Sequence, residues 1–140
     1  MKKVIKTLKR DNSKDGRKAH NDSMLIKVGR IRQNSWAHEK LKAADIYIDE
    51  TELVHIQNKH GKELGTIGME PFDFVCHIVS NYNEIYDDKG DYLLVVKREN
   101  VSNFAAIRLS HEQDSYKIKT AAPIKTKQLL SKKLLCANVH

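Results

Sequence analysis

The chain has 140 residues, of which 40% are apolar, enough for one domain with a hydrophobic core. No apolar run reaches the ~18 residues that a membrane-spanning helix needs, and the basic N-terminus lacks the apolar region of a secretory signal. Cys76 and Cys136 have no CxxC partner and no disulfide framework around them. We therefore expect reduced thiols and a cytoplasmic protein, acting in its own or a target cell.

The net charge of +7 is unevenly distributed along the chain. Residues 1–44 hold 13 lysines and arginines against 4 acids, residues 45–114 hold 6 against 14, and the last 26 residues hold 6 against none. Basic ends around an acidic middle favour binding of a polyanion through those ends. We expect a basic, partly mobile N-terminal extension, residues 1–43, followed by one folded domain, residues 44–140.

Short elements are predicted before residue 50. A strand or helix at Val4–Leu8 lies in an otherwise polar segment. Met24–Ile31 has the composition of a strand, and Ser35–Ala44 that of a helix with Ser35 as N-cap. Asp45–Asp49 alternates as a short strand that leads into the next helix.

The predicted helix at Leu53–Leu64 carries two histidines, two lysines and a glutamate. Asp49 suits its N-cap, with Glu52 completing a capping box, and Gly61 suits the left-handed position that ends a helix. An end at Gly61 places His60 near the negative end of the helix dipole, which favours the imidazolium form.

The remainder predicts a second helix and then an antiparallel meander. Glu70-Pro71 begins the helix, with core spacing through Tyr82. The strands and hairpin turn follow from alternation and turn residues: Glu84–Tyr86, the turn Asp87–Asp91, Tyr92–Arg98, Asn103–Leu109, and Ser115–Ala121 before Pro123. Thr126–Cys136 has the apolar spacing of a C-terminal helix. This order of elements indicates the α+β class.

These segments together resemble the phage-type nucleases of the barnase–EndoU–colicin–RelE superfamily. The resemblance covers about residues 44–135 and is carried by KHGKEL in the polar helix, the strands YLLVVKR and FAAIRL, and TAAPI at the last strand end. It implies N-terminal helices packed on one face of a curved antiparallel sheet of about four strands, with RNA on the other face. It also implies metal-independent RNA cleavage without a cofactor, in which the 2′-hydroxyl attacks phosphorus to leave a cyclic phosphate.

Such a reaction needs a base, an acid and a cation that stabilises the pentacoordinate phosphate. Carried onto this sequence, the resemblance implies His60 first and His55 second for proton transfer. It implies Lys97 or Arg98 for charge neutralisation and Thr120 for a hydrogen bond to phosphate. No carboxylate is clearly placed as base, and Glu63 is the nearest. Further contacts with the RNA are expected from five residues: Lys59, Lys117, Lys119, Arg108 and Thr126.

Each of these residues also has a structural interpretation. His60 can simply cap its helix, and Arg98 can pair with Glu99. Thr120 shares the alternation of Tyr116 and Ile118, which would pack it in the core.

Two other functions remain open at this stage. The main alternative to the ribonuclease is an RNA- or DNA-binding module without catalysis. A third hypothesis is a metal protein that uses His55, His60, His77 or Cys76. However, His60 is five positions after His55, whereas a spacing of four would place two ligands on one helix face. The expected partners are RNA, with tRNA among the candidates, and a cognate immunity protein or antitoxin, with no membrane.

Overall fold

The computed structural model describes residues 24–31 and 41–137 of the chain. Over these residues the elements, in chain order, are β1 (Leu25–Ile31), β2 (Ala44–Asp49), α2 (Glu50–Thr66), α3 (Pro71–Asn81), β3 (Glu84–Asp88), β4 (Asp91–Val96), β5 (Val101–Ser110), β6 (Ser115–Lys125), the 3-10 helix η2 (Thr126–Ser131) and β7 (Lys133–Ala137). The element predicted at Val4–Leu8 and most of the helix predicted at Ser35–Ala44 lie outside the described residues.

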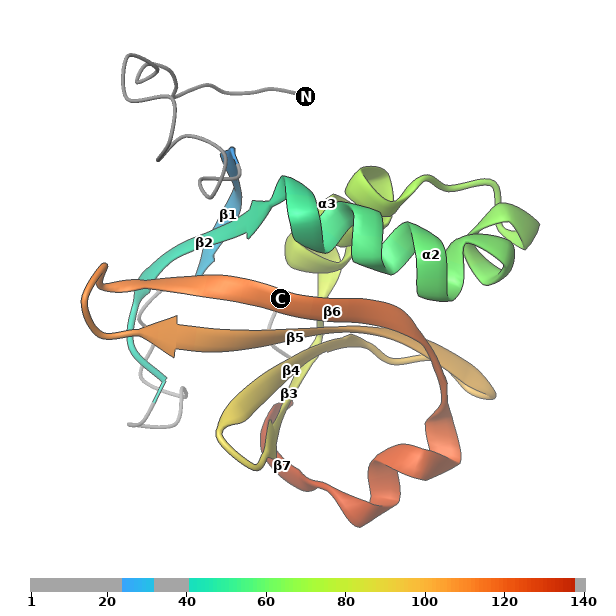
Figure 1. The fold of residues 1–140 in the computed structure, drawn as a ribbon. Coiled ribbons are helices and arrows are strands. Elements are labelled where there is room, and N and C mark those ends of the chain that lie inside the picture. Colours follow the sequence, from blue (N-terminus) through green and yellow to red (C-terminus); the bar gives the residue numbers. More distant parts are fainter. Residues whose placement is uncertain (1–23, 32–40, 138–140) are drawn as a thin grey trace.

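The strands form one seven-stranded mixed sheet in the order β1-β2-β6-β5-β4-β3-β7 (Figure 1). All neighbouring strands are antiparallel except β2 and β6, which run parallel with Ile46 opposite Tyr116. The prediction of helices on a four-stranded antiparallel sheet with a C-terminal helix is therefore wrong. Strands β1 and β2 extend the sheet on one side, and β7 extends it on the other. Residues 25–31, which composition assigned to the N-terminal extension, thus form an edge strand of the sheet.

The predicted C-terminal helix is replaced by η2 and β7. In the antiparallel β3–β7 pair, Leu134 lies opposite Tyr86 and Cys136 lies opposite Ile85. Cys136 is buried. Paired leucines separated by lysines fit one face of a helix as well as they fit a strand. The pairing with β3 decides between the two, because strand preference depends mainly on tertiary packing.

Helices α2 and α3 cover one face of the sheet (Figure 1). As predicted, α3 begins with a proline at its first position, Pro71, where no backbone donor is lost. The main core lies between these helices and the sheet. Its largest fully buried side chains include Phe74 and Ile78 of α3, Ile56 of α2, and Ile46 and Tyr116 of the sheet.

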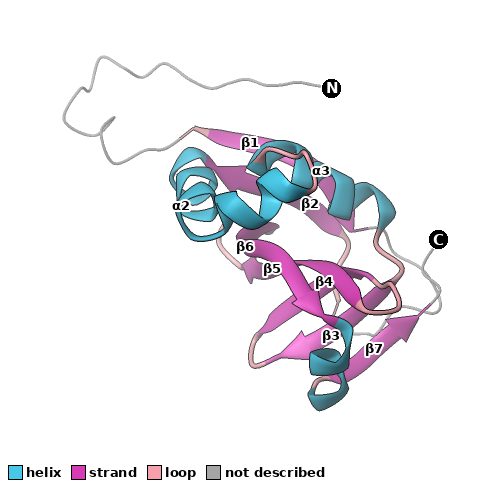
Figure 2. Cartoon of the chain, turned by 90° about the vertical axis from the view of Figure 1, so that its right-hand side faces the viewer, coloured by secondary structure: helices cyan, strands magenta, loops and turns pink. Residues whose placement is uncertain are grey.

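A second apolar cluster lies on the opposite face of the sheet. It joins Leu93 and Val95 of β4 to Tyr86, Ala106 and Leu129, the last of which belongs to η2. Figure 2 shows η2 at the end of the molecule away from α2 and α3. Part of the face that the nuclease resemblance assigned to RNA is therefore occupied by the protein's own C-terminal segment.

Helix α2 is longer than predicted. Asp49 caps its start, as expected, by accepting a hydrogen bond from the Glu52 backbone N–H at 2.8 Å. The helix continues through Gly61 to Thr66, and the left-handed residue that follows it is Gly68, with φ 71°. His60 thus lies inside the helix and not at its end. The expected interaction of its ring with the negative end of the helix dipole is therefore lost.

Candidate active site

His60 and Glu63 form a side-chain pair one turn apart on α2. Nδ1 of His60 lies 2.7 Å from Oε1 of Glu63. Since a carboxylate only accepts hydrogen bonds, Nδ1 carries the proton and Nε2 is the ring nitrogen left for a ligand. The His60 side chain is only 24% exposed. The pair has the form of an imidazole base held by a carboxylate.

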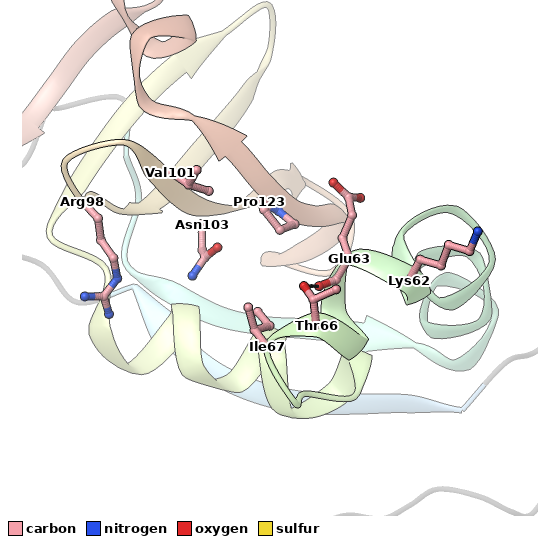
Figure 3. Close-up of a pocket in the computed structure, with 8 residues that line it drawn as sticks. All are labelled: Lys62, Glu63, Thr66, Ile67, Arg98, Val101, Asn103 and Pro123. Carbon is pink, nitrogen blue, oxygen red and sulfur yellow. Dashed lines mark hydrogen bonds between the residues drawn. The ribbon is translucent and has the colours of Figure 1, made fainter.

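An open pocket of about 560 Å³ adjoins this pair, between the end of α2 and the neighbouring ends of β5 and β6. Its volume falls in the range typical of small-molecule sites. The lining comes from α2 and the turn after it, the β4–β5 connection, β5 and β6: Lys62, Glu63, Thr66, Ile67, Arg98, Val101, Asn103 and Pro123 (Figure 3). The pocket therefore joins Glu63, the partner of His60, to Arg98, which was predicted separately.

Two hydroxyl groups hold the backbone of Arg98. Its N–H donates to Oγ of Ser102 at 3.0 Å, and its carbonyl accepts from Oγ1 of Thr126 at 2.8 Å. The two hydroxyls are 2.7 Å apart, and Ser102 is fully buried. This arrangement fixes the β4–β5 connection from which Arg98 projects. Thr126, predicted to contact RNA, instead uses its hydroxyl within the protein.

The charges at the pocket favour an anionic ligand. Among the described residues, no acidic group lies within ion-pair distance of Arg98, whose guanidinium can bind a phosphate through two hydrogen bonds. Figure 3 shows Asn103 directed from β5 toward the end of α2 and Arg98 at the side of the pocket, pointing the same way, whereas Lys62 points away. Among the described residues that line the pocket, Glu63 is the only acid. Arg98 is thus the cation available to a ligand.

His55 belongs to a different group of side chains, at the start of α2. Its ring is 62% exposed and lies 3.9 Å from Glu52. Burial raises the pKa of Glu52 above its ordinary value, against the lowering effect of His55. In this group Lys117 binds the Asp49 carboxylate at 2.9 Å. The structure therefore separates the two predicted histidines. Neither is among the residues that line the pocket, and His60 adjoins it through Glu63.

Three of the predicted RNA-binding cations are already paired with carboxylates. Lys117 binds Asp49, as above, and Arg108 donates to Asp91 at 2.7 Å. Lys97 lies 3.6 Å from Glu84. All three cations are partly exposed, so each pair contributes little to stability, but each must open before its cation can bind a phosphate. Lys59 and Lys119 are exposed and have no ion pair among the residues that the structure describes.

Thr120 lies on the opposite face of the sheet from the one that alternation predicts. The β5–β6 register shifts so that Ile107 pairs with Ile118 and Ala106 pairs with Thr120, leaving Lys119 as the extra residue of a β-bulge. Thr120 therefore shares a face with Ala106 of the second cluster. It neither joins the main core nor reaches the pocket on the helix side.

Sequence reasoning missed most of the pocket. Ile67, Val101 and Asn103 belonged to no motif, and Pro123, although part of TAAPI, was given no role. These residues come together only because β5 and β6 pair beside the end of α2. The His60–Glu63 spacing of three residues was the one local signal, since such residues are neighbours on a helix.

No group of three metal-ligating side chains occurs in residues 24–31 and 41–137. His55, His60, His77 and Cys76, the residues of the metal hypothesis, thus do not form such a group. The described helices also include none with the length and apolar character that crossing a membrane requires.

Comparison of the chain with protein-family models, with curated proteins and with solved structures found no match. The nuclease resemblance stays a prediction.

Proposed function

We propose that the protein is a metal-independent endoribonuclease with its active site at the pocket beside α2. The observation that carries this proposal is the meeting of two chemical groups at one pocket. Glu63, which holds the His60 ring at 2.7 Å, lines the same pocket as Arg98. A positioned imidazole and an unpaired guanidinium are the base and the phosphate-binding cation that cleavage by a 2′-hydroxyl requires.

The reaction proceeds by transfer of the 2′-hydroxyl proton to Nε2 of His60. The 2′-oxygen attacks the adjacent phosphorus, the bond to the 5′-oxygen breaks, and a 2′,3′-cyclic phosphate forms. Arg98 stabilises the extra negative charge on the phosphate in the transition state. Glu63 stabilises the imidazolium formed in the first step. No histidine is among the described residues that line the pocket, which His60 adjoins through Glu63. Solvent water therefore supplies the proton of the leaving oxygen.

RNA as substrate also accounts for the distribution of charge. Residues 115–140 hold six lysines and no acid, and lysines attract a phosphate backbone regardless of base sequence. Lys125, the last residue of β6, is exposed and stands opposite Val101 of the pocket lining. RNA that leaves the pocket along β6 meets this basic segment. Such an enzyme acts in the cytosol and calls for a cognate inhibitor or antitoxin.

The test is cleavage of total RNA by the purified protein in the presence of a chelator, with the fragment ends mapped. Cyclic phosphate at the 3′ end and hydroxyl at the 5′ end are the expected products. His60→Ala should abolish cleavage without lowering the melting temperature. His111→Ala is the matched control, because His111 is an exposed histidine on the turn at the other end of β5. Equal cleavage by His60→Ala and the wild type would refute the assignment of the site.

A binding module without catalysis is the second candidate. It is favoured by the six lysines of residues 115–140, which attract a phosphate backbone without any catalytic group. It predicts salt-dependent RNA binding with intact RNA at the end of the incubation.

A further inference from the structure

The amide of Asn103 is an unused hydrogen-bonding group inside the pocket. The side chain is half-buried on β5, and no other described residue forms a hydrogen bond with it. Figure 3 shows it directed into the pocket, between Arg98 and Pro123. A half-buried amide without a partner in the protein can bond to solvent. An amide without one in a pocket is available to a ligand.

Two exposed aliphatic side chains lie in the same lining. Ile67 is 48% exposed and Val101 is 50% exposed, which places both among the few large apolar side chains that are exposed in residues 24–31 and 41–137. They come from different elements, the turn after α2 and the start of β5. Single exposed apolar residues need no explanation. Two that line one pocket, together with Pro123, form an apolar surface against which a flat ring can pack.

We propose that this pocket binds one unpaired nucleotide, whose base packs against Ile67 and Val101 and is selected by Asn103. The identity of the ligand as RNA rests on the function proposed above. Arg98 binds the phosphate of the same nucleotide. Proteins read RNA sequence mainly from unpaired bases, because only their edges and faces are accessible to side chains. The substrate class is therefore single-stranded RNA.

The chemistry of the amide indicates which base fits. An amide presents a donor and an acceptor side by side, and this pattern matches the amino group and N7 of adenine. The amino group and N7 lie on the Hoogsteen edge of adenine, and guanine presents two acceptors on that edge, so the amide oxygen would face an acceptor. The proposal is that Asn103 binds this Hoogsteen edge, on which adenine is the base that fits.

The test measures binding of short single strands to the full-length protein carrying His60→Ala, so that no strand is cleaved. Four fluorescent RNA heptamers, uridines with A, C, G or U at the centre, are compared by anisotropy. The strand with adenine should bind about tenfold more tightly than the all-uridine strand. A complementary strand that pairs the adenine should remove this advantage.

Asn103→Leu keeps the approximate size of the side chain and removes the amide, so it should bind all four strands equally. Asn103→Ala provides a second variant if leucine impairs folding, which the melting temperature reports. Asn100→Leu is the control, because Asn100 is an exposed amide on the adjoining turn outside the lining. A preference for adenine that persists in both Asn103 variants, equal binding of all four strands by the parent protein, or a preference for another base would overturn the proposal.

The outcome is independent of catalysis. Selective binding of adenine by a protein that leaves RNA intact would refute the ribonuclease and support the nucleotide site. Cleavage of RNA together with equal binding of all four strands would support the ribonuclease and refute the nucleotide site.

Discussion

Nδ1 of His60 lies 2.7 Å from Oε1 of Glu63, three residues further along α2. The contact fixes the orientation of the imidazole ring and the nitrogen that carries its proton. It is short because residues three apart on a helix are neighbours, and because α2 continues through Gly61 so that both residues belong to one regular helix. The catalytic base of the proposed reaction is thus set by local helix geometry.

Glu63→Gln tests this relationship. The amide oxygen can still accept the hydrogen bond from His60, but the negative charge that stabilises the imidazolium is lost. We expect the rate of RNA cleavage to fall by about 10²-fold, the lower range for a positioned proton-transfer group, with little change in the RNA dissociation constant. Glu112→Gln, an exposed acid on the β5–β6 turn, is the control. A cleavage rate within twofold of the wild type would exclude Glu63 from the reaction.

The hydroxyl pair under Arg98 gives a second prediction. Ser102→Ala leaves the partly buried Arg98 N–H without its acceptor, which should lower the free energy of unfolding by about 1 kcal/mol. It should also weaken RNA binding, because Arg98 loses its fixed position. Thr126→Val should act in the same direction, and Thr126→Ser should restore the wild-type values. Ser131→Ala removes an exposed hydroxyl that donates to Gln128 and should change neither quantity in urea unfolding or RNA titration.

If Thr126→Ser and Thr126→Val behave alike, the hydroxyl of Thr126 has no part in holding Arg98.

The start of α2 gives a prediction about pH. Burial alone would raise the pKa of Asp49, but hydrogen bonds from Lys117 and from the Glu52 backbone lower it below 3.8, its ordinary value. The folded state therefore favours the charged carboxylate. The stabilisation is complete above pH 3.8 and is lost as the pH falls through the lower pKa of the folded protein. Asp49→Asn should cost about 0.5–1 kcal/mol at pH 7, since asparagine still caps the helix but cannot pair with Lys117.

Urea unfolding from pH 7 to pH 2 checks this: the difference between the wild type and Asp49→Asn should shrink below pH 3.8. Glu50→Gln, an exposed acid of the same helical turn, is the control for the helix dipole. A difference that stays constant to pH 2 would contradict the role given to the Asp49 charge.

Features of the fold that depend on local chemistry could be predicted from the sequence. The hairpin turn at Lys89 and Gly90 is one, since both residues have positive φ, as a two-residue hairpin requires. Pro71 at the start of α3 is another. Pairings over long distances could not be predicted. The parallel contact of β2 with β6 and the pairing of β7 with β3 join segments far apart in sequence, and no local pattern encodes either.

The candidate site shows the same division. His60 and Glu63 were both named from the sequence, but their contact was not predicted, although a spacing of three on one helix permits it. Arg98 was chosen as the end of a strand, but Asn103 and Ile67 were missed because their meeting depends on how β5 approaches α2. Thr120 was placed on the wrong face because the bulge at Lys119 inverts the alternation beyond it. One extra residue in a strand is enough to move a predicted site residue across the sheet.

The contact between β1 and α3 gives the last prediction. A Cβ added at Gly29 would lie 2.1 Å from Cγ1 of Val79, so Gly29→Ala should destabilise the protein by about 1–3 kcal/mol through overpacking. Adding Val79→Ala removes the clashing methyl, so the double variant should be more stable than the sum of the two single changes predicts. Gly65→Ala is the control, because its Cβ meets no atom within 4 Å and alanine favours the helix by about 1 kcal/mol. Urea unfolding of the four proteins measures these differences. Additive effects of the Gly29 and Val79 changes would show that β1 can move away from α3, and that this close approach does not hold the edge of the sheet against the helix.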